Sequence, residues 1–396
     1  MERRQDRPAP RAERRLLGAA HPVAAGAGDP GAALVADPLA LAPPSAGNAR
    51  GGGQVSPGQG ALLRPATTAL SVAAALALLV GCSSTTEQSN PLQKQLADLC
   101  ARTDQTDAVE VSNASSLSAA LAGARPGQRI YPKPGVYQGP FDATASGTPD
   151  APIALCGGAD VELTGRKGGY ALHLEGSSWW SIQGIRIHDA QKGVVLDRTT
   201  HTSLVSLQIA EIEQEAVHLR TNSSDNTVVG LRIQDTGQTD PEFGEGIYIG
   251  SAKSNWCRYT NCSPDASDRN LIEGNTFGPG ITAENIDVKE GTTGGTIKDN
   301  KLSGAGATDT DSWIDVKGNN WQITGNTGSD TSKDGMQVHV PVPGWGAGNQ
   351  FSANTMTVNA PGYGVFVDDD APGTVVSCGN TATGAASGLT NVQCTP

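Results

Sequence analysis

The chain has 396 residues, of which 50 are glycine, 4% are aromatic and 17% are charged. A coiled coil or a helical bundle needs many more charged residues and leucines, so this composition excludes both classes. The formal net charge of −12 argues against a nucleic-acid-binding protein, which normally carries a basic stripe, and we expect no nucleic-acid partner.

The N-terminal 81 residues have the composition of a leader. Residues 1–60 are rich in Arg, Ala, Pro and Gly without an apolar period, and they predict a disordered leader or a mis-assigned start. Residues 61–81 resemble a lipoprotein signal peptide, because Arg64 precedes an apolar run at 69–80 that is too short for a stable transmembrane helix.

That run ends in Leu79-Val80-Gly81-Cys82, which resembles the bacterial lipobox, where the cysteine is lipidated and becomes the new N-terminus. The resemblance implies an extracellular, cell-surface lipoprotein anchored to the membrane through Cys82. The alternative is an ordinary signal peptide with a chance cysteine. Residues 82–105 then predict a flexible tether, and residues 106–396 a folded domain.

The remaining cysteines also indicate export. An even number of cysteines in an exported chain suggests disulfides. Proximity in sequence favours the pairs Cys257–Cys262 and Cys378–Cys394, which leaves Cys100–Cys156. A zinc site is the alternative, but no CxxC pair is present.

One six-residue unit recurs through the rest of the chain. Its third and fifth positions are apolar in all eight copies, and its second position is Gly or Ala in six of them. The copies are YALHLE (170–175), KGVVLD (192–197), EAVHLR (215–220), EGIYIG (245–250), ENIDVK (284–289), SWIDVK (312–317), DGMQVH (334–339) and YGVFVD (363–368). A second run follows the later copies and brings asparagines into register at Asn275, Asn300, Asn326, Asn354 and Asn380.

A period of 22 to 39 residues with short strands in each repeat is the signature of a solenoid. No coil can bury its own apolar face, so the coils stack into one continuous core. We therefore predict an all-β fold, a right-handed parallel β-helix of about ten coils. Residues 115–124 predict a short helix with a serine cap, whose Leu117 and Leu121 cover the open N-terminal end.

Stacking turns equivalent positions into columns about 4.8 Å apart. The fourth position is outward and includes Tyr248, Asp287, Asp315 and Gln337 in consecutive copies. Together with the first and sixth positions, it predicts a compact charged face. Its members are Glu245, Glu284, Asp287, Asp315, Asp334, Lys289, Lys317 and His339.

The run GQRIYPKPGVYQGPFDATASGTPDAPIALCGG (127–158) resembles the opening coils of the pectin-lyase-like β-helix superfamily, and of polysaccharide lyase family 6 in particular. In that family a strand begins with a Glu that binds Ca²⁺ and ends with a Lys that acts as the base. In this sequence Glu284 and Lys289 stand at the corresponding positions. The family's second Glu falls on Thr282 and its Arg on Lys317, so this chain departs from the pattern at both positions.

The resemblance implies β-elimination on an acidic, uronate-containing polysaccharide. The proton next to a carboxylate becomes removable once a cation neutralises that carboxylate. We expect Lys289 to be the base, because a neighbouring like charge lowers the pKa of a lysine. Lys317 would be its electrostatic helper, and His339 is a further catalytic candidate. Glu245, Glu284, Asp287 and Asp315 offer the hard oxygens that suit Ca²⁺.

Two other functions remain open at this point. A β-helix glycoside hydrolase would use Asp287 and Asp315 as paired acids, although adjacent coils hold them closer than inverting enzymes need. A non-catalytic surface β-helix would bind glycans without turnover. In all three cases we expect a monomer.

Overall fold

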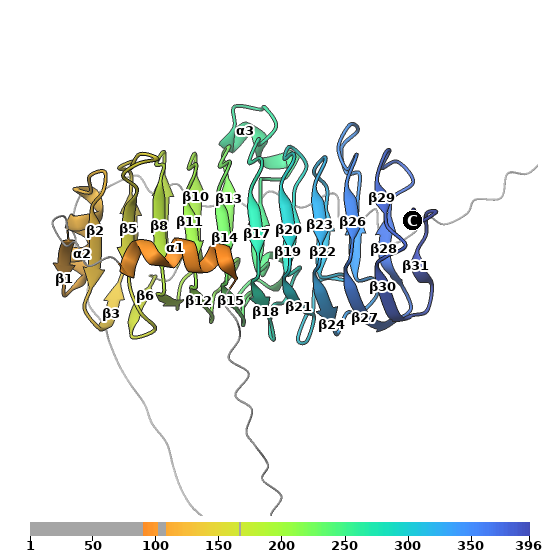
Figure 1. Cartoon of the computed structure of the whole chain (residues 1–396), viewed down its shortest axis with the longest axis horizontal. Coiled ribbons are helices and arrows are strands. Elements are labelled where there is room, and N and C mark those ends of the chain that lie inside the picture. The colour runs from red at the N-terminus through yellow and green to blue at the C-terminus, as the bar shows by residue number, and fades with distance from the viewer. Residues whose placement is uncertain (1–89, 102–107, 166–167) are drawn as a thin grey trace, which may run out of the picture. The chain divides into compact units, whose positions relative to one another are not determined.

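The computed structural model describes residues 90–101, 108–165 and 168–396. Within them it confirms the all-β prediction: three parallel sheets wind into a right-handed parallel β-helix of about 10 turns (Figure 1). The predicted leader, the signal run and Cys82 lie outside the described residues. None of the helices in the described part of the chain is long and apolar enough to span a membrane.

Each full coil contributes one strand to each sheet, so strands that are neighbours in space come from successive coils. Sheet A contains, in order, β1 (Ala108–Val111), β2 (Arg129–Pro132), β5 (Ile153–Cys156), β8 (Trp180–Gln183), β11 (Ser203–Val205), β14 (Thr227–Val229), β17 (Leu271–Glu273), β20 (Thr296–Lys298), β23 (Gln322–Thr324), β26 (Gln350–Ser352) and β29 (Val375–Val376). Sheet B contains β3 (Gly135–Gln138), β6 (Val161–Thr164), β9 (Arg186–His188), β12 (Gln208–Ile209), β15 (Arg232–Ile233), β18 (Thr276–Phe277), β21 (Lys301–Ser303), β24 (Thr327–Ser329), β27 (Thr355–Ala360) and β30 (Thr381–Ala385).

The eight predicted hexads supply eight of the ten strands of sheet C. It contains β4 (Phe141–Ala143), β7 (Tyr170–Glu175), β10 (Lys192–Asp197), β13 (Val217–Arg220), β16 (Ile247–Ile249), β19 (Ile286–Val288), β22 (Ile314–Val316), β25 (Met336–Val338), β28 (Tyr363–Val367) and β31 (Gly388–Thr390). The apolar third and fifth positions of the eight hexads are all buried in the core. The stacking of the hexads is therefore confirmed.

The small residue at the second hexad position has a steric cause. A Cβ on Gly246 would lie 2.6 Å from the carbonyl oxygen of Asn285, and one on Gly193 would lie 2.4 Å from that of Ala216. Both oxygens belong to the next coil, so a side chain here would push the coils apart.

The predicted asparagine ladder is also present. The backbone N–H of Asn300 donates to Asn326 Oδ1 at 3.0 Å, and the N–H of Asn326 donates to Asn354 Oδ1 at 3.0 Å. Each side-chain amide before the last, Asn380, also donates to the next asparagine and to a backbone carbonyl, as Asn326 does to Asn354 and to Ile297. Because Asn326 is fully buried, these bonds satisfy polar groups that water cannot reach.

The described residues also contain three helices, α1 (Pro91–Ala101), α2 (Ala114–Ala122) and α3 (Trp256–Tyr259), with the 3₁₀ turns η2 (Pro241–Phe243) and η3 (Lys253–Asn255). Helix α2 packs on the first strands through buried Leu117 and Leu121, as predicted. Its N-cap is Asn113 rather than the expected serine, and Ser116 completes a capping box with it.

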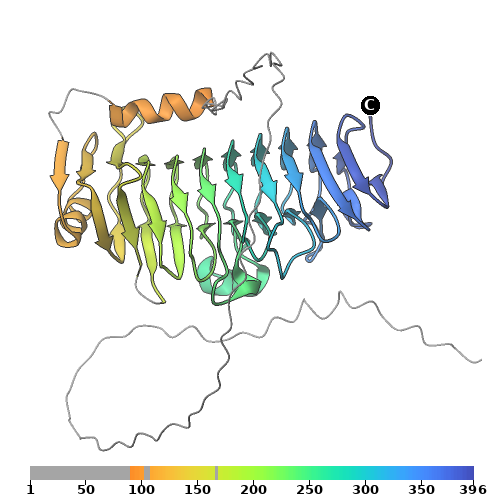
Figure 2. The same ribbon diagram turned by 90° about the horizontal axis from the view of Figure 1, so that it is seen from below.

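Part of the predicted tether is helical and packed on the domain. Helix α1 lies across strands of sheet A (Figures 1 and 2) and contacts β5, β8 and β11. Gln183 donates to the Leu96 carbonyl at 2.8 Å, and Cys100 is joined to Cys156 of β5. The docking of this helix could not be predicted from the sequence, because none of its side chains is buried.

All three predicted disulfides are confirmed. They are Cys100–Cys156, Cys257–Cys262 and Cys378–Cys394. The second closes the short loop that carries α3, and the third ties the last residues to the C-terminal coil.

Candidate active site on the outer face of sheet C

The side chains predicted for catalysis and metal binding lie on the outer face of sheet C, where β16, β19, β22 and β25 run side by side. In each strand the residue between two core side chains points outward. The register pairs Tyr248 with Asp287, Asp287 with Asp315, and Asp315 with Gln337. The predicted column is therefore confirmed. We call the outward side chains of these four strands and of their flanking residues the charged face.

Two lysines and a histidine form a chain of ion pairs across the charged face. The Lys289 ammonium contacts Asp287 Oδ2, and Lys317 Nζ lies 2.8 Å from Asp287 Oδ1. Lys317 Nζ also lies 2.6 Å from Asp315 Oδ2, and His339 Nδ1 lies 2.8 Å from Asp315 Oδ1. The Asp287 side chain is only 2% exposed. The three predicted catalytic side chains are thus joined by two buried carboxylates rather than spread over a solvated sheet.

The protonation state of Lys289 differs from the sequence-based expectation. Burial lowers the pKa of Lys289, but Asp287 and Glu245 outweigh burial and hold that pKa well above its ordinary value. The pKa of Lys317 is raised in the same way, because burial lowers it and two aspartates raise it more. The expected lowering by a like charge is wrong, because each ammonium turns toward carboxylates. Both lysines are charged at neutral pH.

Three of the four predicted metal ligands form one cluster. Carboxylate oxygens of Glu245, Glu284 and Asp287 lie within 4.8 Å of one another. Asp315 lies outside this cluster, and Lys317 and His339 engage its two oxygens. Glu245 and Glu284 come from the corners of adjacent coils, where each precedes its strand.

The cluster has the properties of a divalent-cation site. Glu245 is 4% exposed, and its Oε2 has no hydrogen-bond partner among the residues that the structure describes. A buried carboxylate oxygen in this position requires either a proton or a cation. Burial and neighbouring carboxylates raise the pKa of Glu245 and raise that of Glu284 to about 7. Since carboxylate oxygens are the donors that Ca²⁺ prefers, these three residues fit such an ion.

Tyr248 is a further candidate functional residue. Its outward position was predicted from the sequence, but no role was. Lys289 Nζ lies 4.8 Å from the centroid of the Tyr248 ring. The centroid of the His218 ring, on the preceding coil, lies 4.5 Å from the same centroid. In the described part of the chain its hydroxyl has no hydrogen-bond partner. Burial and then Asp287 raise the pKa of Tyr248, so its phenol is neutral. The sequence feature that could have indicated a role is that an ionisable aromatic residue stands next to Asp287 in the outward column.

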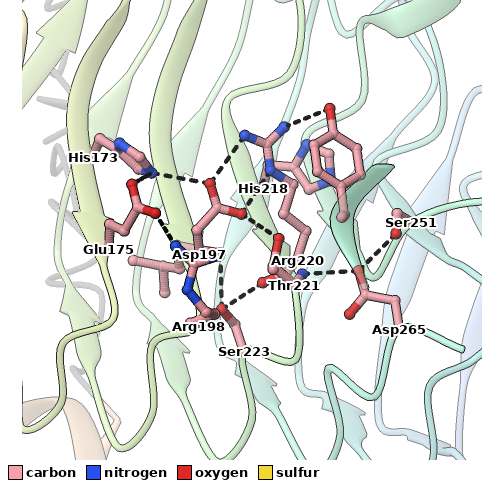
Figure 3. Close-up of polar contacts among 12 residues, drawn as sticks. His173, Glu175, Asp197, Arg198, His218, Arg220, Thr221, Ser223, Ser251 and Asp265 are labelled. Atoms are coloured by element: carbon pink, nitrogen blue, oxygen red, sulfur yellow. Dashed lines mark hydrogen bonds and ion pairs between the residues drawn. The ribbon is translucent and has the colours of Figure 1, made fainter. Parts of the chain in front are cut away.

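A second buried network adjoins the charged face on its N-terminal side (Figure 3). Arg220 binds Asp197 through two bonds, Nε to Oδ1 at 2.8 Å and Nη2 to Oδ2 at 3.0 Å. His173 Nε2 lies 3.0 Å from the same carboxylate. Asp265, in the loop after α3, accepts from the backbone N–H of Thr221 at 2.9 Å. The network therefore fastens the α3 loop beside the catalytic candidates.

Comparisons with known proteins match this architecture. The chain matches no protein-family model and no curated protein sequence. Among solved structures, the alginate lyase from Paenibacillus sp. str. FPU-7 is 36% identical with a TM-score of 0.69, over 73% of this chain and 99% of that chain. The ORF18 protein of Geobacillus virus E2 is 14% identical with a TM-score of 0.54, over 72% of this chain and 60% of its own.

A member of polysaccharide lyase family 6 is also among the solved structures that match. The family 6 alginate lyase AlyGC is 15% identical with a TM-score of 0.43, over 68% of this chain and 40% of its own. The Paenibacillus match is different in kind, because its identity extends over nearly the whole of that enzyme. The chain therefore belongs to the family of the Paenibacillus alginate lyase, within the pectin-lyase-like right-handed parallel β-helices.

Proposed function

We propose that the protein is a polysaccharide lyase that cleaves an acidic, uronate-containing polysaccharide by β-elimination, with alginate as the first substrate to test. The observation that carries this proposal is the placement of the charged Lys289 ammonium over the Tyr248 ring, next to the carboxylate cluster. A lyase needs three groups within reach of one sugar ring: a group that neutralises the substrate carboxylate, a proton acceptor and a proton donor. The charged face holds a candidate for each.

The first requirement is to neutralise the substrate carboxylate, because this acidifies the C5 proton. Lys317 lies beside Asp287 and Asp315 and is charged, so it can pair with a uronate carboxylate. Glu245, Glu284 and Asp287 would hold a divalent cation. When bound, such an ion would neutralise both the substrate carboxylate and the protein carboxylates that raise the pKa of Tyr248.

The second requirement is a pair of proton-transfer groups. Elimination breaks the C5–H bond, forms the C4–C5 double bond and expels the C4 oxygen, which must gain a proton. We assign the proton donor to Lys289, because its raised pKa keeps it protonated and the departing sugar oxygen is a stronger base than an amine. We assign the acceptor of the C5 proton to the phenolate of Tyr248, whose unpartnered hydroxyl lies on the same face. The phenol first releases its own proton to solvent, which the positive charge of Lys317 favours, and its oxygen then takes the C5 proton. The base role expected for Lys289 therefore passes to Tyr248.

The hydrolase alternative receives less support from the charged face. A glycosidase needs one carboxylic acid that is protonated at working pH. Burial raises the pKa of Asp315, but Lys317 and His339 outweigh burial and hold it far below its ordinary value. Asp287 is likewise occupied by two ammonium groups. Asp315 therefore cannot act as the protonated acid of such a pair.

A panel of uronate polymers tests the proposed function. We expect at least one polymer, with alginate the leading candidate, to yield products with the ultraviolet absorbance of a conjugated uronate. New reducing ends without that absorbance would instead indicate hydrolysis. Retention of a polymer without any products would indicate a binding protein.

Removal of divalent cations provides a separate prediction. We expect EDTA to suppress elimination, and added Ca²⁺ to restore it and to raise the midpoint of thermal unfolding. A ligand present at a hundred times its Kd stabilises the folded state by about 2.7 kcal/mol. In Glu245→Gln, both effects of Ca²⁺ should be much smaller. Full activity in EDTA, together with an unfolding midpoint insensitive to Ca²⁺, would show that the cluster works without a metal.

We also propose that the protein is exported and held on the cell surface through Cys82. Its three disulfides support an oxidising compartment, since such bonds are rare in the cytosol. Labelling with a radioactive fatty acid, compared between the wild type and Cys82→Ser, tests the anchor.

A further inference from the structure

A hollow of about 240 Å³ opens on sheet C beside β28, one coil beyond His339. Its walls combine two aromatic rings with one exposed cation. The lining residues are Lys333, Asp334, Pro361, Gly362, Tyr363, Phe366 and Ser387. No part of the proposed catalytic step uses these residues, so the hollow requires its own explanation.

The hollow continues the charged face along the axis of the β-helix. Phe366 pairs in register with Gln337, which pairs with Asp315, so all three belong to the same outward column. From Asp287 on β19 to Phe366 on β28 there are three coil steps, or about 14 Å. A polysaccharide that lies along this column with one ring at Lys289 would extend over Phe366 a few sugar rings away.

The side chains around the hollow suit a sugar that carries a carboxylate. Phe366 and Tyr363 are half-buried, and their ring centroids lie 6.4 Å apart. Lys333 Nζ lies 5.7 Å from the Phe366 centroid, and the His339 ring lies 5.9 Å from it. An aromatic face binds the apolar face of a sugar ring, while an ammonium group binds its carboxylate.

Asp334 gives the hollow a fixed shape. It is fully buried, and its two oxygens accept from Gln337 Nε2 at 2.8 Å and from the backbone N–H of Tyr363 at 2.6 Å. Lys333 Nζ lies 3.3 Å from the same carboxylate and 3.1 Å from Asp311. Its side chain is nevertheless 49% exposed, so the ammonium is accessible to a ligand.

We propose that this hollow is a distal subsite that binds one uronate ring of the same polysaccharide chain on which Lys289 acts. The proposal rests on the proposed function for the identity of the polymer. The volume of the hollow agrees with a single ring, because pockets for larger, drug-sized ligands occupy roughly 300–1,000 Å³.

Kinetics on substrates of two lengths test the subsite. Phe366→Ala and Phe366→Leu should raise KM for a long uronate polymer about tenfold and leave the kinetics on a trisaccharide, which is too short to span both sites, unchanged. Phe366→Tyr keeps an aromatic face and should behave as the wild type. Val136→Ala on sheet B is the matched control, because Val136 is an exposed apolar residue, 64% exposed, away from sheet C. An unchanged KM for the polymer, or an equal effect on the trisaccharide, overturns the subsite.

Retention on immobilised alginate separates this proposal from the proposed function. If the wild type cleaves no uronate polymer, the lyase assignment fails while the subsite is still tested by retention. A roughly tenfold weaker retention of Phe366→Ala than of the wild type then supports the subsite. Equal retention of the two proteins, or no retention of the wild type, overturns it.

Discussion

Replacing Lys289 by alanine is expected to lower turnover of the uronate polymer by about 10³-fold, within the range that a positioned proton-transfer group contributes. The ammonium is the donor for the departing oxygen, and a methyl group offers no proton there. KM should change little, because Lys317 still holds Asp287 and can still pair with the substrate carboxylate. The initial rate of ultraviolet absorbance measures the effect.

Tyr248→Phe removes the partner group and should cause a similar loss. Residues that act as a unit are strongly non-additive, so the double variant should be hardly slower than either single variant. A double variant whose losses multiply would mean that the two side chains act in separate steps.

Lys298→Ala is the matched control for the lysine. Lys298 lies on β20 of sheet A and pairs with Glu273 at 3.1 Å, so its loss removes a lysine–carboxylate pair from a different face. This variant should retain full activity. If Lys289→Ala were fully active while correctly folded, the proposed proton donor would be wrong. The proton would then have to come from a water molecule or from His339, whose pKa Asp315 raises.

The hexads could be predicted to stack because the same apolar pattern recurs within every copy, although the spacing between copies varies. Apolar third and fifth positions fix which side faces the core, and a one-residue slip would expose them all. For this reason the column from Tyr248 to Gln337, the asparagine ladder and the buried Leu117 and Leu121 were all expected correctly. Each of these properties depends on backbone register alone.

Properties that depend on how a long side chain bends were not predictable in this way. Lys289 and Lys317 both turn back onto Asp287, and for Lys289 this reverses the expected direction of the pKa shift. Similarly, Glu284 joins Glu245 although it begins its strand at a corner, whereas Asp315 is drawn away to His339. The register of the repeats therefore predicts which residues are neighbours, but it does not predict which of their side-chain atoms are in contact.

Contacts made by insertions between the repeats were also invisible in the sequence. Asp265 lies in a long loop without a hexad, yet both its oxygens bind the turn after β13, through the N–H groups of Thr221 and Asn222. The same loop brings Tyr259 against Arg220. No repeat in the sequence relates these residues. Only the structure therefore reveals that this loop and the buried network around Arg220 and Asp197 form one unit.

Arg220→Met is expected to destabilise the domain by about 3–5 kcal/mol, the cost of leaving one member of a buried ion pair without its partner. The Arg220 side chain is 7% exposed and that of Asp197 is 10% exposed, so water cannot replace the lost bonds. The guanidinium also lies 4.6 Å from the Tyr259 centroid and donates to the Tyr170 hydroxyl at 3.2 Å. Methionine keeps much of the volume but removes every donor.

The pH dependence of this loss has a definite sign. Burial raises the pKa of Asp197, but hydrogen bonds from His173 and Arg220 outweigh burial and hold the pKa far below its ordinary value. A carboxylate whose pKa is lowered by folding stabilises the folded state at every pH above its pKa in the unfolded chain, which is about 3.9 for aspartate. This stabilisation is lost as the pH falls below that value. The difference in the free energy of unfolding between the wild type and Arg220→Met should therefore be largest at neutral pH. It should become smaller below about pH 3.9.

Urea unfolding of a double-mutant cycle tests this account. Asp197→Leu combined with Arg220→Met replaces both charges by apolar groups, a change that is often close to neutral for a buried pair. We expect the double variant to recover most of the stability that Arg220→Met loses. If instead the two losses add, the pair is not the source of the destabilisation, and the packing of Arg220 between Tyr170 and Tyr259 carries it.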